Sequence, residues 1–141
     1  MPQFYPLAGC EVIAALVQAE LAASKLRLFQ DSLPAPDPST PIADYVANEA
    51  DFTGYPAGGE TITAWLDPIL DPLGGYSIGS GTEQFATDNP TTVGNIIAGA
   101  WLENAAGDII SVVVFTTPIP MQMPGQGIPI DLRLVFPTGE A

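Results

Sequence analysis

The sequence contains no histidine, a single cysteine and only three cationic side chains, which stand against sixteen carboxylates. Histidine is the side chain whose unperturbed pKa lies nearest neutral pH and is also a common zinc ligand. Its absence removes the usual residue for acid–base catalysis and for most zinc sites. Charged residues make up 13% of the chain, about half of the roughly 25% found in average soluble domains. This scarcity of reactive and charged groups argues against catalysis and favours a protein that binds or builds.

The acidic balance of the chain limits its partners. The formal net charge is −13 and the isoelectric point lies near 4.1. Such a chain repels nucleic-acid phosphates and anionic membrane surfaces, so we expect neither as a partner. The apolar run after Cys10 carries Glu11, Gln18 and Glu20, which makes it too short and too polar to span a bilayer. Cys10 has no second cysteine to pair with inside the chain, and we expect a small buried side chain.

The carboxylates offer few chemical sites. Glycoside hydrolysis needs only two acids and no histidine, so this one enzyme class stays formally open. The acids are scattered singly through predicted turns, however, and we predict that the chain is not an enzyme and has no catalytic residue. Asp44, Glu49 and Asp51 do not have the spacing of a calcium loop, although a loose surface calcium site stays open. We predict no metal ligand and no cofactor.

The proline and glycine content favours a turn-rich β protein with one helix. The chain has fifteen prolines and fourteen glycines in 141 residues. Residues 1–9 are punctuated by proline and are expected to form an extended arm. Apolar residues recur at helical spacing after this arm, which predicts a helix over residues 10–24. The stripe consists of Val12, Ile13, Leu16, Val17 and Leu21.

Strand patterns and turns account for the remainder of the chain. Residues 25–30 alternate and predict a strand, whereas the four prolines in residues 31–41 predict an extended connector without a core of its own. A short helical turn is expected around residues 44–50, and further strands over residues 61–66, 76–79, 82–87, 94–102, 108–115 and 128–136. Seven strands predict a mainly β fold, either a β-sandwich or a small β-barrel, with one N-terminal helix. The apolar stripe of this helix packs either on its own domain, which is the favoured interpretation, or on a partner chain. Residues 10–141 are expected to form a single domain.

The predicted strand over residues 108–115 has an unusual pattern. It follows a turn in which Gly107 is expected to supply a positive φ, so the two flanking strands form a predicted β-hairpin. Residues 109–115 are apolar on both faces of the strand, and on an exposed edge such a run is an aggregation hazard. We therefore expect this strand to be central in its sheet or covered by another subunit.

Three groups of side chains are candidates for contacts with partners. Prolines hold residues 116–127 extended and the loop presents two methionines, so it either docks on an apolar surface or folds back onto its own domain. The three cations lie on predicted strands and face either a partner's carboxylates or those of the same chain. The arm adds two aromatic residues. The candidate interface residues are therefore Phe4, Tyr5, Lys25, Arg27, Met121, Met123 and Arg133.

Aromatic side chains offer an alternative kind of site. Tyr55, Trp65, Tyr76 and Trp101 are able to stack on sugar rings. Both tryptophans lie in predicted strands, where an indole usually belongs to the core, so the core is the favoured interpretation and a glycan site the alternative.

Short motifs spread over most of the chain resemble a pattern in small virion structural proteins of tailed bacteriophages. They are KLRLF (25–29), AD (43–44), EADFTGY (49–55), TITAW (61–65), NAAGD (104–108) and PIPM (118–121). The resemblance covers roughly residues 24–137 and excludes the N-terminal helix and arm. It implies a capsid decoration (cement) protein, a structural protein that binds the outer surface of a capsid and stabilises it.

The same resemblance implies the partners. They are the major capsid protein and further copies of the chain, commonly as a homotrimer, on the exterior of the virion. The alternatives are a receptor- or glycan-binding module associated with a head fibre or tail, and a head–tail joining protein, which forms a ring of higher order. Low charge with high hydropathy agrees with a protein completed by assembly, because permanent interfaces are more apolar than free surface.

Overall fold

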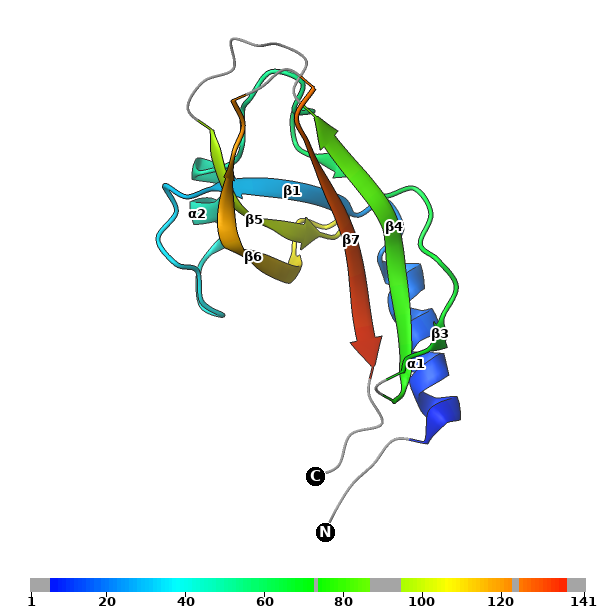
Figure 1. The fold of residues 1–141 in the computed structure, drawn as a ribbon. Coiled ribbons are helices and arrows are strands. Elements are labelled where there is room, and N and C mark those ends of the chain that lie inside the picture. Colours follow the sequence, from blue (N-terminus) through cyan, green and yellow to red (C-terminus); the bar gives the residue numbers. More distant parts are fainter. Residues whose placement is uncertain (1–5, 73, 87–94, 123–124, 137–141) are drawn as a thin grey trace. The chain divides into compact units, whose positions relative to one another are not determined.

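The computed structural model describes residues 6–72, 74–86, 95–122 and 125–136 (Figure 1). Its elements are α1 (Leu7–Glu20), β1 (Lys25–Gln30), α2 (Ile42–Ala47), β2 (Glu60–Thr61), β3 (Ile69–Leu70), β4 (Tyr76–Ala86), β5 (Ile96–Glu103), β6 (Ile109–Pro120) and β7 (Gly127–Phe136). The strands form two antiparallel sheets, in the orders β2-β1-β5-β6 and β3-β4-β7, and the described strands close no barrel. The predicted mainly β fold with one N-terminal helix is confirmed.

The chain divides into two compact units. Unit 1 contains residues 1–22, 62–83 and 130–141, and unit 2 contains residues 23–61 and 84–129. The long strands β4 and β7 contribute residues to both units. The prediction of a single domain over residues 10–141 stays a prediction, and each unit is described here by itself.

The four-stranded sheet of unit 2 is built around a long hairpin. β5 and β6 pair from Glu103 opposite Ile109 to Ile96 opposite Pro120, and β1 pairs with β5 on its other side. The turn is closed by the backbone N–H of Asp108, which donates to the Asn104 side-chain oxygen at 2.8 Å. Gly107 has a φ of 91°, so the predicted hairpin and its glycine are confirmed.

An aromatic cluster forms the core of this unit. Phe29, Tyr45 and Trp101 are buried, with ring centroids 5.5 to 6.5 Å apart. Leu33 of the 31–41 segment is buried with them. The segment has no helix or strand, as expected for a connector, and Leu33 attaches it to the aromatic rings of the unit's core.

The helix of unit 1 begins earlier than predicted. α1 starts at Leu7 after the extended residue Pro6, because proline is favourable at a helix N-terminus. It ends at Glu20, and Ala23 adopts a φ of 60° that a helix cannot continue. The predicted arm over residues 1–9 is thus wrong for residues 7–9, which are helical, and residues 1–5 lie outside the described part of the chain.

Strand boundaries differ from prediction where glycine or proline interrupts a pattern. The predicted strands over residues 76–79 and 82–87 are the single strand β4, in which Gly81 has a φ of 71° without ending the strand. β6 continues to Pro120 because an edge strand tolerates proline. The strand predicted over residues 61–66 is reduced to Glu60–Thr61, and the two-residue strand β3 was not predicted.

Candidate functional site

The most connected group of polar side chains surrounds Arg27 on β1. Its guanidinium donates two hydrogen bonds to Glu49, Nε to Oε1 at 2.9 Å and Nη2 to Oε2 at 2.6 Å. Nη1 donates to the Glu103 carboxylate at 3.1 and 3.3 Å. The guanidinium carbon also lies 5.1 Å from the ring centroid of Trp101. The side chains of Arg27, Glu49 and Glu103 are 13 to 15% exposed and Trp101 is buried, so the ion pairs are largely removed from water.

Tyr55 completes this cluster. Its hydroxyl donates to Glu49 Oε1 at 2.8 Å and accepts the backbone N–H of Leu28 at 3.1 Å. Burial raises the pKa of the Tyr55 hydroxyl above its ordinary value. The hydrogen bonds that Arg27 donates to Glu49 raise the pKa of the guanidinium, against the lowering effect of burial. In this cluster two carboxylates hold one cation, and the neutral Tyr55 phenol holds one of the carboxylates. The arrangement fixes β1, β5 and residue 49 together.

A groove of about 480 Å³ lies beside this cluster. Its lining residues are Val46, Glu49, Ala50, Asp51, Tyr55, Ala57 and Gly58. The Glu49 carboxylate is already bonded to Arg27 and Tyr55, and Asp51 accepts a hydrogen bond from the Asn95 side chain at 2.8 Å. Within the described residues no three acidic or sulfur side chains converge as metal ligands. The acids of this groove therefore serve the packing of the chain.

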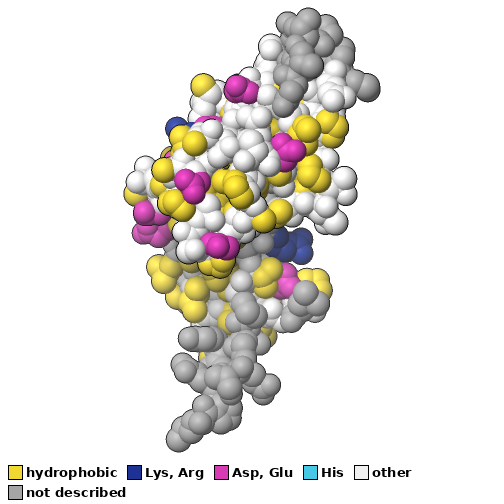
Figure 2. Space-filling model, turned by 90° about the vertical axis from the view of Figure 1, so that its left-hand side faces the viewer, with side chains coloured by type: hydrophobic (Ala, Val, Ile, Leu, Met, Phe, Trp, Pro, Cys, Tyr) yellow, Lys and Arg dark blue, Asp and Glu magenta, His cyan; other side chains and the backbone are white. Residues whose placement is uncertain are grey.

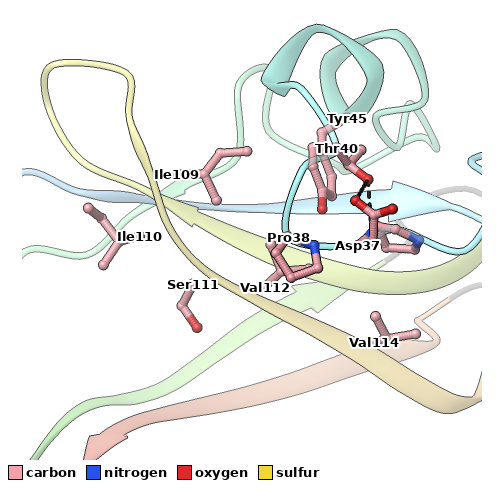
Figure 3. A pocket seen from close by; sticks show the side chains of 10 residues that line it. Asp37, Pro38, Thr40, Tyr45, Ile109, Ile110, Ser111, Val112 and Val114 are labelled. Atoms are coloured by element: carbon pink, nitrogen blue, oxygen red, sulfur yellow. Dashed lines mark hydrogen bonds between the residues drawn. The ribbon is translucent and has the colours of Figure 1, made fainter.

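A second groove, of about 420 Å³, runs beside β6 (Figure 3). One side consists of β6 side chains, among them Ile110, Val112 and Val114. The facing side is formed by the connector and α2, with Asp37, Pro38, Thr40 and Tyr45 turned toward the strand. β6 is also the last strand of its sheet, so the alternative that this apolar strand is central is wrong.

Apolar side chains are exposed on α1 as well as on β6. The exposed residues on α1 are Leu7, Val12, Ile13 and Leu16, with Leu16 64% exposed, whereas Cys10 and Ala14 are buried. On β6, Ile110 is 41% and Val114 56% exposed. Figure 2 shows one face of the molecule, on which hydrophobic and acidic side chains are interspersed and little of the surface belongs to Lys or Arg.

The structure separates the predicted interface residues. Lys25 is exposed at the start of β1, whereas Arg27 is engaged with carboxylates of its own chain, one of the two alternatives that the sequence left open. Arg133 has a side chain that is 54% exposed, with Nη1 3.8 Å from the Asp71 carboxylate.

The other predicted interface residues lie in a loop and in the arm. Met121 is fully buried, so the expectation that it is presented for docking is wrong and the folded-back alternative holds for it. Its backbone N–H donates to the Asn95 carbonyl at 2.9 Å, which ties this residue to the segment just before β5. Phe4, Tyr5 and Met123 lie outside the described residues.

The tryptophans contribute more to packing than to a surface. Trp101 is buried, which confirms its predicted place in the core. Trp65 is half-buried, and its indole N–H donates to the Leu21 carbonyl at 3.1 Å within unit 1. The Trp101 ring is therefore closed to a sugar, and the indole N–H of Trp65 is already bonded within its own unit.

Comparison with protein-family models, with curated proteins and with solved structures finds no match. The resemblance to phage virion proteins therefore stays a prediction. None of the described helices is long and apolar enough to cross a membrane.

Proposed function

We propose that this chain is a capsid decoration (cement) protein of a tailed bacteriophage. It binds the major capsid protein on the outside of the shell and associates with further copies of itself, as a homotrimer. It acts by holding neighbouring shell subunits together and performs no chemistry.

The observation that carries this proposal is the apolar side chains left in water on α1 and β6. Burying such side chains is favourable by roughly 25 cal/mol per Å² of apolar surface, so both surfaces gain from contact with another molecule. A monomeric protein rarely leaves such surface without a use for it. Glu49 and Asp51, in contrast, are hydrogen-bonded to Arg27, Tyr55 and Asn95 of the same chain, which supports a structural role.

The charge of the chain supports an exterior location. A net charge of −13 is unfavourable beside packaged DNA and favourable on an outer surface, where it also keeps particles dispersed. Several modest contacts made by one oligomer raise the apparent affinity by roughly 10²- to 10⁴-fold, so no single contact has to be strong. The glycan-binding alternative has less support, because Trp101 is buried and Trp65 is hydrogen-bonded to its own unit.

Locating the chain on particles tests the proposal. Intact DNA-filled particles of the virus that encodes this chain are labelled with gold-conjugated antibodies against it and imaged by electron microscopy. Labels spread over the whole shell support decoration. Labels confined to one vertex or to the tail overturn the proposal in favour of a joining or tail-associated protein, and unlabelled particles overturn it altogether. Native mass spectrometry of the purified chain distinguishes a trimer from a larger ring.

A further inference from the structure

We infer that the free edge of β6, together with the groove beside it, accepts an extended apolar segment of another protein that carries a basic side chain. The segment adds a strand to the sheet of unit 2. That the segment belongs to the shell protein rests on the proposed function, whereas its chemistry follows from β6 and the groove.

The two sides of the four-stranded sheet differ in how many of their outward backbone groups are already hydrogen-bonded. On the outer side of β1, Lys25 and Leu26 pair with β2. Farther along β1, the Leu28 N–H donates to the Tyr55 hydroxyl and the Gln30 N–H donates to the Asn48 carbonyl at 2.8 Å. Along β6, no described strand pairs with the outer side. The outward backbone donors and acceptors of β6 are therefore the ones that an added strand would use.

β6 carries few of the devices that normally protect an edge, since its prolines lie at its far end and its other irregularities are two register shifts in its pairing with β5. Exposed edge strands are usually short, charged, interrupted by proline or covered. β6 is twelve residues long, contains no charged residue, and has prolines only at Pro118 and Pro120. β7, an edge of the other sheet, carries Pro129, Asp131 and Arg133 on its exposed positions. The molecule thus protects one long edge and leaves the other open.

The regular part of β6 defines the length of the added strand. Val114 pairs with Gly99, but the next pair joins Ile119 to Ile97, so the residues between Val114 and Ile119 leave the regular register. Ser111 to Val114 is the continuous stretch, because a second register shift leaves Ile110 between the pairs Leu102–Ser111 and Glu103–Ile109. Val114 is exposed, and Val112, two residues away on the same face of the strand, is half-buried, so this stretch provides apolar contacts for a strand with alternating side chains.

Asp37 supplies the electrostatic preference of the groove. It is the single charged residue among the ten that line it. Its carboxylate accepts hydrogen bonds from the Ser39 N–H and the Ser39 hydroxyl, both at 2.7 Å. The hydrogen bond from the Ser39 hydroxyl, with that from its N–H, lowers the pKa of Asp37, which keeps the carboxylate charged at neutral pH. A basic side chain on the incoming segment is the natural partner for this charge.

A second copy of the chain does not match these requirements. The chain has three cations, of which Arg27 is bonded to two carboxylates, and Arg133 shares the exposed face of β7 with Asp131 and lies 3.8 Å from Asp71, so the strand that carries it is not basic. The remaining cation, Lys25, belongs to a strand that is paired on both sides, opposite Thr61 and Glu103, and cannot join a new ladder. A copy would also bring a net charge of −13. We therefore commit to a segment of a different, basic protein.

The test measures binding of synthetic peptides to the purified full-length chain by fluorescence anisotropy. The probe is an eight-residue peptide of alternating valine and threonine in which two threonines are replaced by lysine. A second peptide has glutamate in place of lysine, and a third has the lysine sequence with alternate backbone amides methylated, which removes ladder donors. We expect the lysine peptide to bind, the glutamate peptide to bind at least about tenfold more weakly, and the methylated peptide to lose binding.

Variants of the chain locate the site. Val114→Lys places a charge on the open edge at an exposed position, and we expect it to lower the affinity for the lysine peptide at least about tenfold. Asp37→Asn should lower the same affinity about two- to fivefold. Val135→Lys, at an exposed position of β7, is the matched control and should leave binding unchanged. Circular dichroism and urea unfolding verify that each variant folds.

The outcomes separate the inference from the proposed function. Absence of peptide binding, equal binding of the methylated peptide, or binding unaffected by Val114→Lys overturns the inference. A wild-type oligomer that Val114→Lys dissociates also overturns it, because the occupant is then a second copy. If the peptide binds at β6 but antibodies do not find the chain on the shell, the inference stands and the proposed function fails.

Discussion

Replacing Arg27 with methionine should cost this protein a large part of its stability. The substitution keeps an apolar stem against Trp101 but removes the cation that Glu49 and Glu103 share. The side chains of all three residues of the ion-pair cluster are only 13 to 15% exposed, so water cannot fully replace the lost guanidinium. Breaking a buried ion pair by removing one partner costs about 3–5 kcal/mol, out of a total near 5–15 kcal/mol for a typical domain.

The matched control lies in the same chain. Arg133→Met removes an arginine whose side chain is 54% exposed and whose nearest carboxylate oxygen, on Asp71, is 3.8 Å away. A pair of this kind contributes about 0–1 kcal/mol. The two variants remove the same chemical group, so a difference in their stabilities reports the environment of Arg27.

Urea unfolding at pH 7 measures both variants. The chain has two tryptophans, and a Trp65→Phe background leaves Trp101, beside Arg27, as the fluorescent reporter. With a slope near 2 kcal/mol per M, Arg27→Met should lower the urea midpoint by about 2 M and Arg133→Met by less than about 0.5 M. A loss below about 1 kcal/mol for Arg27→Met, or equal losses for the two variants, would refute the role assigned to the cluster.

Three further predictions concern Tyr55, Gly99 and Cys10. Tyr55→Phe should lower the free energy of unfolding by about 1–3 kcal/mol at pH 7, because two hydrogen bonds are lost. The pKa of Tyr55 is raised in the folded chain, so wild-type stability falls once the unfolded phenol ionises, and the stability difference between wild type and variant should narrow above about pH 10 in urea titrations. A difference that stays constant with pH contradicts this. Gly99→Ala should cost about 1–3 kcal/mol, since its Cβ would overlap the Val113 carbonyl and the Phe29 ring; an unchanged melting temperature argues against that packing. Cys10 is 1% exposed and should react with a thiol reagent only as urea opens the chain, so immediate reaction in buffer would show that α1 is loosely held.

The sequence predicted correctly the strands and turns that a short stretch of residues defines by itself. The strand Lys25–Gln30 matches its predicted bounds, because its alternation and the following prolines mark both ends. The hairpin follows from two apolar runs around Gly107. In contrast, Gly79 and Gly81 indicated a break that β4 does not make, since neighbouring strands hold the backbone through these glycines. The two-residue strands β2 and β3 exist only through their partners, and a single sequence carries no signal for them.

The candidate sites depend on pairings between distant residues. Arg27 is 22 residues from Glu49 and 76 from Glu103, so the sequence identified the cation but left its partners open. For residues 109–115 the sequence established that both faces are apolar, but the place of the strand within the sheet required the structure. For α1 the sequence identified the apolar stripe but left open whether it packs on its own domain or on a partner chain, and the structure shows Val12 and Leu16 of that stripe exposed.

The division into two units has a consequence for how the molecule is made. The chain passes between the units after residues 22, 61, 83 and 129, so neither unit is a continuous piece of sequence. Unit 2 lacks part of its chain until residue 129 has left the ribosome, and unit 1 lacks its last segment until the residues from Ile130 onward have been synthesised. Truncation at any single point removes part of both units or leaves one incomplete, and the buried side chains of α1, Cys10 and Ala14, belong to an incomplete unit until the residues from 130 onward have been synthesised.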